Sequence, residues 1–548
     1  MIIDAREIAP GSTVVCEICI VGSGAAGITV AHELLGQGKD VALLEGGSLR
    51  REAAAQELYQ GEVVDAERHG ALDQYRQRRF GGTTTVWGGR CAPFDEIDFE
   101  ARPHVPYSGW PISKRDLDSY YSRAHEYCEL GAYVYTAREA LPDGPPSLIP
   151  GFRANGVLDD SLWRFSPPTD FGKRYREALR RSASARLYLH ANCLKLPMGP
   201  GGAIERIEAA SAPGHTFTVK ARQFVLAAGG LEVPRLLLAS RAGNDLTGRF
   251  YISHITGDAG EVVCTPRGGD VVWGYERTPD GIYCRRSMAI SAERQRREGL
   301  LNFRAILSHP PPADPSHGNG ILSSMYLMKA LLAHRIPPEY SGELSGMRTM
   351  RHIGAHCGNI AGDVPALIAF SRTWLRKRVF SGRKLPSVSF RGRNNVYTMH
   401  FDAEQSPNPD SRVTLSDQTD RFGIPRLRVD WRPSGRDVES VVRCCRILGK
   451  ALDASGVGRL LFDPEQVAET IRRTSGVGSH HIGATRMAAD ASRGVVDADC
   501  RVYGTQNLFI AGPSVFPTSS FANPTLTAVA LAIRLAEHLA GRPARGGQ

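Results

Sequence analysis

Long apolar runs, which a membrane-spanning protein needs, are missing from this 548-residue sequence. No stretch of roughly eighteen apolar residues occurs, so the sequence predicts no transmembrane segment. The N-terminal residues MIIDAREIAPGSTVVCE contain neither a basic region followed by an apolar stretch nor a twin arginine, so no secretion signal is expected. Tandem repeats and low-complexity segments do not stand out either. These absences predict a cytoplasmic, globular protein.

Paired cysteines and metal-ligand patterns are also scarce. The eleven cysteines are an odd number and lie scattered along the chain, which is typical of reduced thiols in a cytosolic protein. Cys16 and Cys19 form a C-x-x-C, but they lie in the apolar run VVCEICIVG, which predicts a buried strand. No second pair and no histidine at ligand spacing accompany them, so we expect no metal site. Cys444 and Cys445 lie in a helical pattern and are predicted core residues.

The basic charge is diffuse. The formal net charge of +10 rests mostly on arginines spread through the sequence, and it predicts no nucleic-acid partner. The segment 372–384 is locally basic, with Trp374 and Phe380 among its cations. It could touch a membrane surface or a phosphorylated substrate, but the favoured interpretation is a solvated helix face. A chain of this length is expected to form two domains.

A dinucleotide-binding motif opens the chain. Apolar residues 16–22 predict a strand, Gly22, Gly24 and Gly27 form G-x-G-x-x-G, and ITVAHELLGQG continues as a helix. The glycines permit a tight turn, close approach of the backbone to a pyrophosphate, and close packing of helix on strand. The next strand, DVALLE, ends at Glu45, which is placed to accept hydrogen bonds from ribose hydroxyls. The helix N-terminus offers free N–H groups to the phosphates.

FAD is favoured over a nicotinamide cofactor, because an enzyme that uses both usually needs a second motif and none is found. RQFVLAAGG, residues 222–230, predicts a further strand and loop against the dinucleotide, and RLYLHANCLKL could supply a strand beside the adenine. The loop RFGGTTTVWGGRCAPF, residues 79–94, can wrap an isoalloxazine ring, although a plain surface loop would read similarly. The FAD contacts predicted in these segments are Gly22, Gly24, Gly27, Glu45, Thr83, Thr84, Trp87, Cys193 and Ala228.

Two polar side chains near the C-terminus are the candidate catalytic pair. His480 opens the string HHIGATRM, and Asn523 lies before the apolar helical pattern TLTAVALAIRLAEHL. A neutral imidazole can take the hydroxyl proton of an alcohol as hydride leaves the carbon, and an amide can hold the oxygen in place. The alternative is that His480 and His481 are core histidines at a helix end.

These segments resemble the glucose-methanol-choline (GMC) oxidoreductases over nearly the whole chain. The resemblance is carried by GSGAAG with Glu45, GGTTTVWGG, FVLAAGG, H-x-x-G at His480, GVVDADCRVYGTQNLFIAGPSVFPT and ANPTLT. RFSPPTDFGKRYREAL and YTMHFDAEQSPNPDSRVTLS are most similar to the pyranose-oxidase and sugar-dehydrogenase branch. The resemblance implies that His480, three residues before Gly483, is the base, with Asn523 opposite. It also implies that Gly512, Pro524 and Thr525 contact the FAD.

The same resemblance carries further expectations. His400 falls where the pyranose-oxidase branch has a histidine beside the substrate, and Thr398 lies on the same polar strand. Some relatives attach FAD through a histidine just before the tryptophan of the glycine-rich loop. Here that position is Val86, so noncovalent FAD is expected.

The predicted fold is α/β, with a Rossmann-like FAD domain interleaved with a substrate domain on a largely antiparallel sheet covered by helices. The FAD domain is assigned residues 1–95, 185–260 and 470–548, and the substrate domain 96–184 and 261–469. The predicted function is oxidation of an alcohol to a ketone by hydride transfer to flavin N5, and the expected substrate group is a secondary hydroxyl of a sugar, glycoside or aminocyclitol. O2 or another acceptor would reoxidise the flavin. The alternatives are an oxidase of an apolar alcohol such as a sterol, and a non-catalytic FAD-binding flavoprotein.

Overall fold

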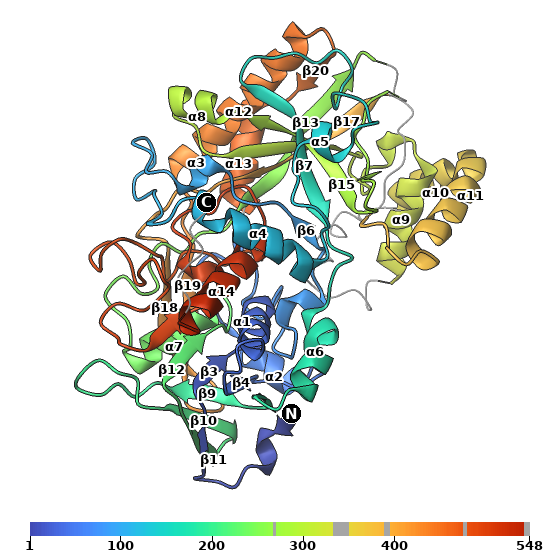
Figure 1. Cartoon of the computed structure of the whole chain (residues 1–548). Coiled ribbons are helices and arrows are strands. Elements are labelled where there is room, and N and C mark those ends of the chain that lie inside the picture. Colours follow the sequence, from blue (N-terminus) through green and yellow to red (C-terminus); the bar gives the residue numbers. More distant parts are fainter. Residues whose placement is uncertain (267–269, 333–349, 388–394, 475–478, 542–548) are drawn as a thin grey trace.

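A parallel sheet forms the base of the molecule in the computed structural model, which describes all residues except 267–269, 333–349, 388–394, 475–478 and 542–548 (Figure 1). Its six strands follow the order β1-β8-β4-β3-β12-β21, and every neighbouring pair is parallel. The strands are β1 (Ile2–Asp4), β8 (Ala185–Leu189), β4 (Val41–Leu44), β3 (Ile18–Val21), β12 (Gln223–Leu226) and β21 (Leu508–Ile510).

Continuous apolar sequence explains why this sheet is interior. Every residue of β3 and β4 is buried, as expected for parallel strands covered on both faces. Helix α1 (Ala25–Leu35) packs on β3 and β4, α14 (Thr525–Leu539) packs on α1, and α4 (Arg115–Cys128) packs on α14. Figure 1 shows these three helices together above the sheet. Cys16 and Cys19, from the C-x-x-C, are buried here.

The second large sheet of the molecule is antiparallel. Its path is β20-β13-β17-β16-β15-β7-β6, and β14 pairs with β15. The strands are β20 (Gly458–Leu461), β13 (Ile255–Cys264), β17 (Val396–Ala403), β16 (Phe303–Ser308), β15 (Tyr283–Ile290), β7 (Val157–Phe165), β6 (Arg90–Cys91) and β14 (Glu276–Arg277). Helices α12 (Gly435–Ala454) and α13 (Pro464–Thr474) cover one face, where Cys444 and Cys445 join the apolar core, as predicted.

Smaller elements complete the chain. One four-stranded sheet contains β2 (Thr13–Val15), β11 (His215–Lys220), β10 (Ile207–Ala212) and β9 (Asn192–Lys195), and one three-stranded sheet contains β18 (Arg412–Thr419), β19 (Pro425–Asp430) and β5 (Gly61–Val63). The remaining α-helices are α2 (Ala53–Glu57), α3 (Glu96–Phe99), α5 (Ala137–Ala140), α6 (Phe171–Arg181), α7 (Glu232–Ser240), α8 (Ala292–Glu298), α9 (Gly320–Leu331), α10 (Met350–Gly362) and α11 (Val364–Trp374).

The predicted α/β fold with an antiparallel second sheet is confirmed. Strands of the parallel sheet come from the start of the chain, from residues 185–226 and from residues 508–510, so this unit is discontinuous. Strand β6 and the beginning of β13 pair in the antiparallel sheet, although both lie in ranges assigned to the FAD domain, and the exact domain boundaries stay a prediction. Within the described residues, no helix has both the length and the apolar character needed to cross a membrane.

Candidate active site

The glycine turn between β3 and α1 forms a cradle for a dinucleotide. Gly22 has φ +101°, and a Cβ there would lie 2.6 Å from the carbonyl oxygen of Ala227. A Cβ at Gly27 would lie 1.9 Å from the oxygen of Gly22, so helix and strand approach as closely as the motif predicts. Gly24 is the N-cap of α1, makes no side-chain cap, and has open space beside it. The first-turn N–H groups can therefore bind phosphate oxygens.

Glu45 is buried at the end of β4. Its Oε2 accepts hydrogen bonds from the backbone N (3.3 Å) and the hydroxyl (2.5 Å) of Ser23, and its Oε1 accepts from the N of Gly47 at 2.8 Å. A carboxylate oxygen can accept two hydrogen bonds, so Oε1 retains capacity for one more donor. The ribose contact predicted for Glu45 fits this geometry.

A cavity of about 490 Å³ extends from the glycine turn to the C-terminal loop. Nearly all predicted cofactor and catalytic residues line it: Gly22, Gly24, Glu45, Thr83, Thr84, Trp87, Cys193, Ala228, His480, Gly512, Asn523, Pro524 and Thr525. Gly27 does not line the cavity, because it faces the backbone of Gly22. Thr398 and His400 do not line it either.

Two buried polar atoms without a hydrogen-bond partner in the protein indicate that this cavity binds a large polar ligand. Arg78 and Glu232 both line the cavity, and they contact each other at 3.4 Å. The Nε of Arg78 and the Oε2 of Glu232 are nonetheless buried without a hydrogen-bond partner in the protein. Buried polar atoms in native proteins are nearly always paired, so a bound dinucleotide fits these residues.

The glycine- and threonine-rich loop lies along the same cavity. Thr83 is exposed to it, whereas the hydroxyl of Thr84 donates to Gly81 O at 2.6 Å and holds the loop closed. Trp87 anchors the loop by donating from its indole nitrogen to Thr169 O at 3.0 Å. Val86 lines the cavity beside them.

His480 reaches the far end of the cavity through an antiparallel bridge. Ile252 and Ile482 exchange both backbone hydrogen bonds, at 3.0 Å each. In antiparallel register the residues two positions away on each side also face one another, which places His480 opposite His254. Their Nδ1 atoms lie 2.7 Å apart, and Nε2 of His254 lies 3.0 Å from Ser519 O.

Asn523 completes the pair from the loop before α14. Its Nδ2 lies 3.0 Å from Nε2 of His480, and its Oδ1 accepts a hydrogen bond from Nε of Arg90 at 2.9 Å. Arg90 is held in turn by a bidentate ion pair with Asp402 (2.7 and 2.9 Å) and lies 4.4 Å over the Trp163 ring. Arg90 thus fixes which end of the Asn523 amide faces His480. The site presents one acceptor nitrogen and one donor nitrogen side by side, which matches a hydroxyl group.

Burial and neighbouring charges keep the imidazole of His480 neutral. Burial, with further contributions from His254 and Arg90, holds the pKa of His480 well below its ordinary value. Burial also lowers the pKa of His254. Burial opposes ionisation of Asp402, but Arg90 and His400 outweigh it and keep the pKa of this carboxyl below its usual range. The charged pair Arg90–Asp402 therefore lies next to two neutral histidines.

His481 also lines the cavity, but its ring packs beside two other aromatic rings. Its ring is 7% exposed and lies 6.2 Å from the Tyr251 ring and 6.3 Å from the His69 ring, measured between centroids. Of the two adjacent histidines, His480 is the one that contacts Asn523.

Thr398 and His400 lie on β17, on the same face as Asp402, because alternate residues of a strand share a face. Tyr397, Met399 and Phe401 point into the apolar core on the other side. His400 contacts Asp258 on the neighbouring strand, with Nδ1 2.8 Å from Oδ1. Their assignment to the substrate stays a prediction.

Sequence reasoning missed four residues of the site: Arg78, Arg90, His254 and Asp402. Arg78 belongs to the basic string YRQRRFGG directly before the glycine-rich loop, which is a local signal. Asp402 could have been found from its alternation with Thr398 and His400. Arg90 lies at the end of the glycine-rich loop 79–94, but nothing in that motif predicts its contact with Asn523. His254 belongs to no motif, since sheet pairing alone brings it to the site. In the described part of the chain, no cluster of three His, Cys, Asp or Glu could hold a metal ion.

Comparison with known proteins agrees with this geometry. The family model described as FAD dependent oxidoreductase matches residues 17–311, so the chain is an FAD-dependent oxidoreductase. The model described as GMC oxidoreductase matches residues 407–532, which include His480 and Asn523. The chain belongs to the GMC oxidoreductase family, and FAD is its cofactor.

Individual relatives match either nearly the whole chain at low identity or a shorter part of it at higher identity. The 6'''-hydroxyparomomycin C oxidase of Streptomyces lividus is 25% identical, covering 96% of this chain and 92% of its own. The C-glycoside 3-oxidase of Arthrobacter globiformis is 38% identical over 125 residues, 22% of each chain. The crystal structure of pyridoxine 4-oxidase from Mesorbium loti aligns with a TM-score of 0.51 at 17% identity, covering 95% of this chain and 99% of that one. This likeness concerns the fold alone.

Acid precipitation of the purified yellow protein is expected to release its FAD into the supernatant. Val86 has an aliphatic side chain at the loop position where a histidyl link would form, and it lines the cavity. The flavin should therefore be held by noncovalent contacts alone. The measurement is flavin absorbance in supernatant and pellet. Flavin that stays with the denatured pellet would contradict the expectation.

Proposed function

We propose that this enzyme oxidises a hydroxyl of a sugar-like polyol, glycoside or aminocyclitol to a carbonyl. In this proposal His480 is the general base and Asn523 is the hydrogen-bond donor to the reacting oxygen. The observation that carries the proposal is the 3.0 Å contact between His480 Nε2 and Asn523 Nδ2 on the cavity wall. An amide nitrogen only donates, so the imidazole nitrogen opposite it carries a lone pair.

The two nitrogens suit an alcohol that loses a proton. The hydroxyl hydrogen can be donated to His480 Nε2, while the oxygen accepts from Asn523 Nδ2. As the proton moves to His480, negative charge develops on the oxygen, and the Asn523 N–H stabilises it. Arg90 keeps the Asn523 amide aligned for this task. FAD, when bound, supplies the hydride acceptor.

The polar sheet face supports a polyhydroxylated substrate. Arg90, Asp402, His400 and Thr398 place donors and acceptors on the side of β17 that carries the Arg90–Asp402 pair. A ring with several hydroxyls needs such partners, because an unpaired buried hydroxyl costs affinity. The relatives named above as a hydroxyparomomycin oxidase and a C-glycoside oxidase add support. An apolar sterol would offer no hydrogen-bond partners to this polar face.

The direct test is anaerobic mixing of the holoenzyme with a panel of sugars, glycosides, aminocyclitols and sterols. Loss of the flavin's visible absorbance reports reduction without any assumption about the electron acceptor. We expect rapid reduction by at least one polyhydroxylated substrate. Rapid reduction by a sterol, with none by any polar alcohol, would overturn the substrate class while leaving the catalytic pair in place.

The rate of flavin reduction is expected to stay constant from pH 8 down through the ordinary histidine pKa of about 6.5. The neutral form of His480 is the active base, and its lowered pKa keeps it neutral over this range. The rate should fall only at lower pH, as protonation occupies Nε2. Stopped-flow reduction measured across pH checks this. An acid limb at or above the ordinary value would assign the titration to another group.

Replacing His400 by Ala is expected to raise KM for the best polar substrate roughly 2–10-fold, since one hydrogen bond contributes about 0.5–1.5 kcal/mol. FAD binding should be unchanged, because His400 does not line the cavity. A change in which carbon of the substrate is oxidised would support the same role for His400. Asp258→Asn is the matched control, since it removes the charge beside His400 and keeps the imidazole. Unchanged kinetics in His400→Ala would remove this residue from the substrate site.

A further inference from the structure

The tautomer of His480 is determined by a chain of hydrogen bonds that starts outside the cavity. A carbonyl oxygen only accepts, so the 3.0 Å contact with Ser519 O requires a proton on Nε2 of His254. Neutral His254 then has its lone pair on Nδ1, 2.7 Å from Nδ1 of His480. The proton between the two rings must belong to His480. Its Nε2 is left with the lone pair that faces Asn523.

We propose that His254 is a positioning residue that keeps the proton of His480 on Nδ1 and the basic lone pair on Nε2. The proposal deepens the proposed function and rests on the role of His480 as base. In the other tautomer, two lone pairs would face each other between the rings, and the Nε2–H of His480 would point at the donor amide of Asn523. Both contacts are buried, so leaving them unpaired would be unfavourable. His254 therefore selects the tautomer of His480 that can act as a base.

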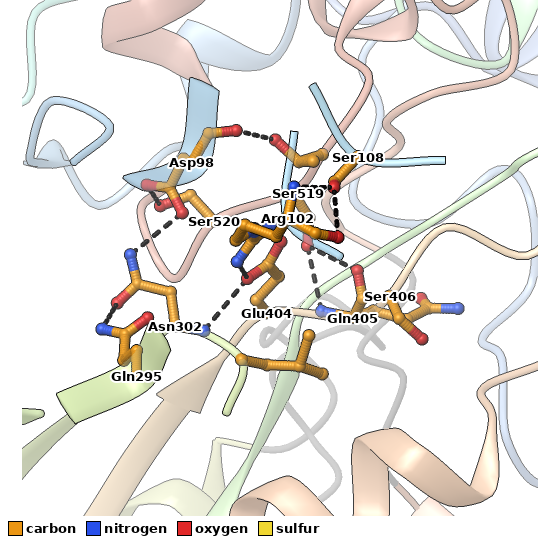
Figure 2. A network of polar contacts seen from close by, with 12 residues as sticks. Asp98, Arg102, Ser108, Gln295, Asn302, Glu404, Gln405, Ser406, Ser519 and Ser520 are labelled. Carbon is orange, nitrogen blue, oxygen red and sulfur yellow. Dashed lines mark hydrogen bonds and ion pairs between the residues drawn. The ribbon is translucent and has the colours of Figure 1, made fainter. Parts of the chain in front are cut away.

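A buried polar network keeps the acceptor for His254 in place. Gln405 N donates to the Ser519 hydroxyl at 3.0 Å, and the Ser520 hydroxyl donates to Asp98 Oδ2 at 2.6 Å. Figure 2 shows these serines between Asp98 and Gln405, beside the buried ion pair of Arg102 and Glu404. Ser519 and Ser520 belong to the loop that carries Asn523, so the network also fixes the loop itself.

The first test measures the tautomer directly. The holoenzyme is labelled with ¹⁵N-histidine, and long-range ¹H–¹⁵N correlation separates protonated from unprotonated ring nitrogens, with His480→Ala assigning the signals of His480. We expect a protonated Nδ1 and an unprotonated Nε2. The opposite assignment would overturn the proposal. This readout needs no substrate, so the absence of any reactive alcohol would refute the proposed function and leave the tautomer result standing.

The second test uses His254→Asn and His254→Leu. Asn can place an amide oxygen near the former Nδ1 and accept from His480, whereas Leu cannot. We expect His254→Leu to slow flavin reduction roughly 10–100-fold, the usual effect of removing an orienting partner, with KM and FAD content nearly unchanged and an altered acid limb of the pH profile. His254→Asn should recover much of the rate. Equal loss in both variants, or a rise in KM alone, would contradict a positioning role.

A separate observation concerns the helices at the right-hand edge of Figure 1. Helix α11 continues into a π-helix (Leu375–Val379), and large apolar side chains are exposed along both and at the end of α9. Leu331 is 76% exposed and Phe380 79%. Val364, Ile368, Leu375 and Val379 are also exposed, at a spacing that places them on one side of the helix. We name Val364, Ile368, Leu375, Val379 and Phe380 the apolar stripe.

Among the described residues of this segment, the exposed charges have one sign. Arg372, Arg376, Lys377 and Lys384 are exposed, and no residue that the structure describes forms an ion pair with them. Asp363 is the sole carboxylate among the described side chains of 320–332 and 352–387, and it is buried, accepting from Gly320 N at 3.1 Å. Like charges on both sides would oppose pairing of this face with a second copy of the chain.

We infer that the apolar stripe and its cations bind the surface of an anionic lipid bilayer. The apolar side chains would enter the boundary between headgroups and acyl chains, while the cations pair with lipid phosphates. A neutral apolar partner would satisfy the stripe and leave the cations unpaired. The charge pattern therefore favours an anionic bilayer.

Vesicle sedimentation of the holoenzyme tests this. Binding is expected to phosphatidylcholine vesicles containing phosphatidylglycerol, to weaken with salt, and to be small with phosphatidylcholine alone. Leu375→Glu with Phe380→Glu, or Arg376→Gln with Lys377→Gln, should lower partitioning roughly tenfold or more, with flavin reduction unchanged. Leu461→Glu, at an exposed apolar residue on β20, is the matched control. No binding to anionic vesicles, or self-association that depends on the stripe, would overturn the inference.

Discussion

His480→Ala is expected to retain FAD and to slow flavin reduction roughly 10²–10⁴-fold, the contribution of a positioned general base. The imidazole is the group that can accept the hydroxyl proton beside Asn523, and without it hydride must leave a fully protonated alcohol. The cofactor cradle lies at Gly22–Gly27 and Glu45, so FAD content should not change. Stopped-flow absorbance with the best substrate gives the rate, and the visible spectrum gives the flavin content.

His481→Ala is the matched control, since it removes the neighbouring imidazole, which packs beside Tyr251 and His69. It should slow reduction far less than His480→Ala. If it proved the more damaging of the two, the base would have been assigned to the wrong histidine. Loss of FAD in both variants would instead indicate a structural defect of the segment.

Asn523→Asp is expected to slow flavin reduction about 10²–10³-fold, the usual effect of losing one hydrogen-bond donor to a developing oxyanion. The substitution preserves the shape and the acceptor for Arg90, and it replaces the amide N–H that faces His480 with a carboxylate oxygen. Asn523→Ala should have a similar effect. An Asp variant with nearly full activity would show that this position needs only shape or an Arg90 partner.

The double variant His480→Ala with Asn523→Ala adds a test of shared action. Both groups are proposed to contact one oxygen, so their combined effect should fall short of the product of the separate effects. A combined effect equal to the product of the two separate effects would mean that the two residues act on different steps. The same stopped-flow assay serves for all three variants.

Local motifs account for what the sequence could predict. The glycine turn, Glu45 and the strands beside them lie within one short segment, and each glycine has a steric reason that the structure confirms at Gly22 and Gly27. Burial of Cys444 and Cys445 followed from helical periodicity. His480 and Asn523 were separable from core residues because an H-x-x-G histidine and an Asn-Pro helix start are unusual in an apolar setting.

Long-range pairing accounts for what the sequence could not predict. His254 faces His480 only because Ile252 and Ile482 form a bridge, and no local pattern contains that register. Arg90 reaches Asn523 from an edge strand paired with β7. Asp402 shares its face with His400, but its ion pair depends on where β6 lies. The residues that orient the catalytic pair are therefore set by tertiary register.

The position of β12 between β3 and β21 has a consequence for how the chain folds. Phe224 pairs with Cys19 on one side and with Leu508 on the other, so the parallel sheet closes only when segments from both ends of the sequence meet. Closing so long a loop costs entropy before the new contacts repay it, which makes this step slow. The chain between β12 and β21 must become compact before these two strands can pair. We therefore expect the flavin cavity to form late in refolding, and we expect free FAD, which binds only the formed cavity, to shift the folding equilibrium toward the native state.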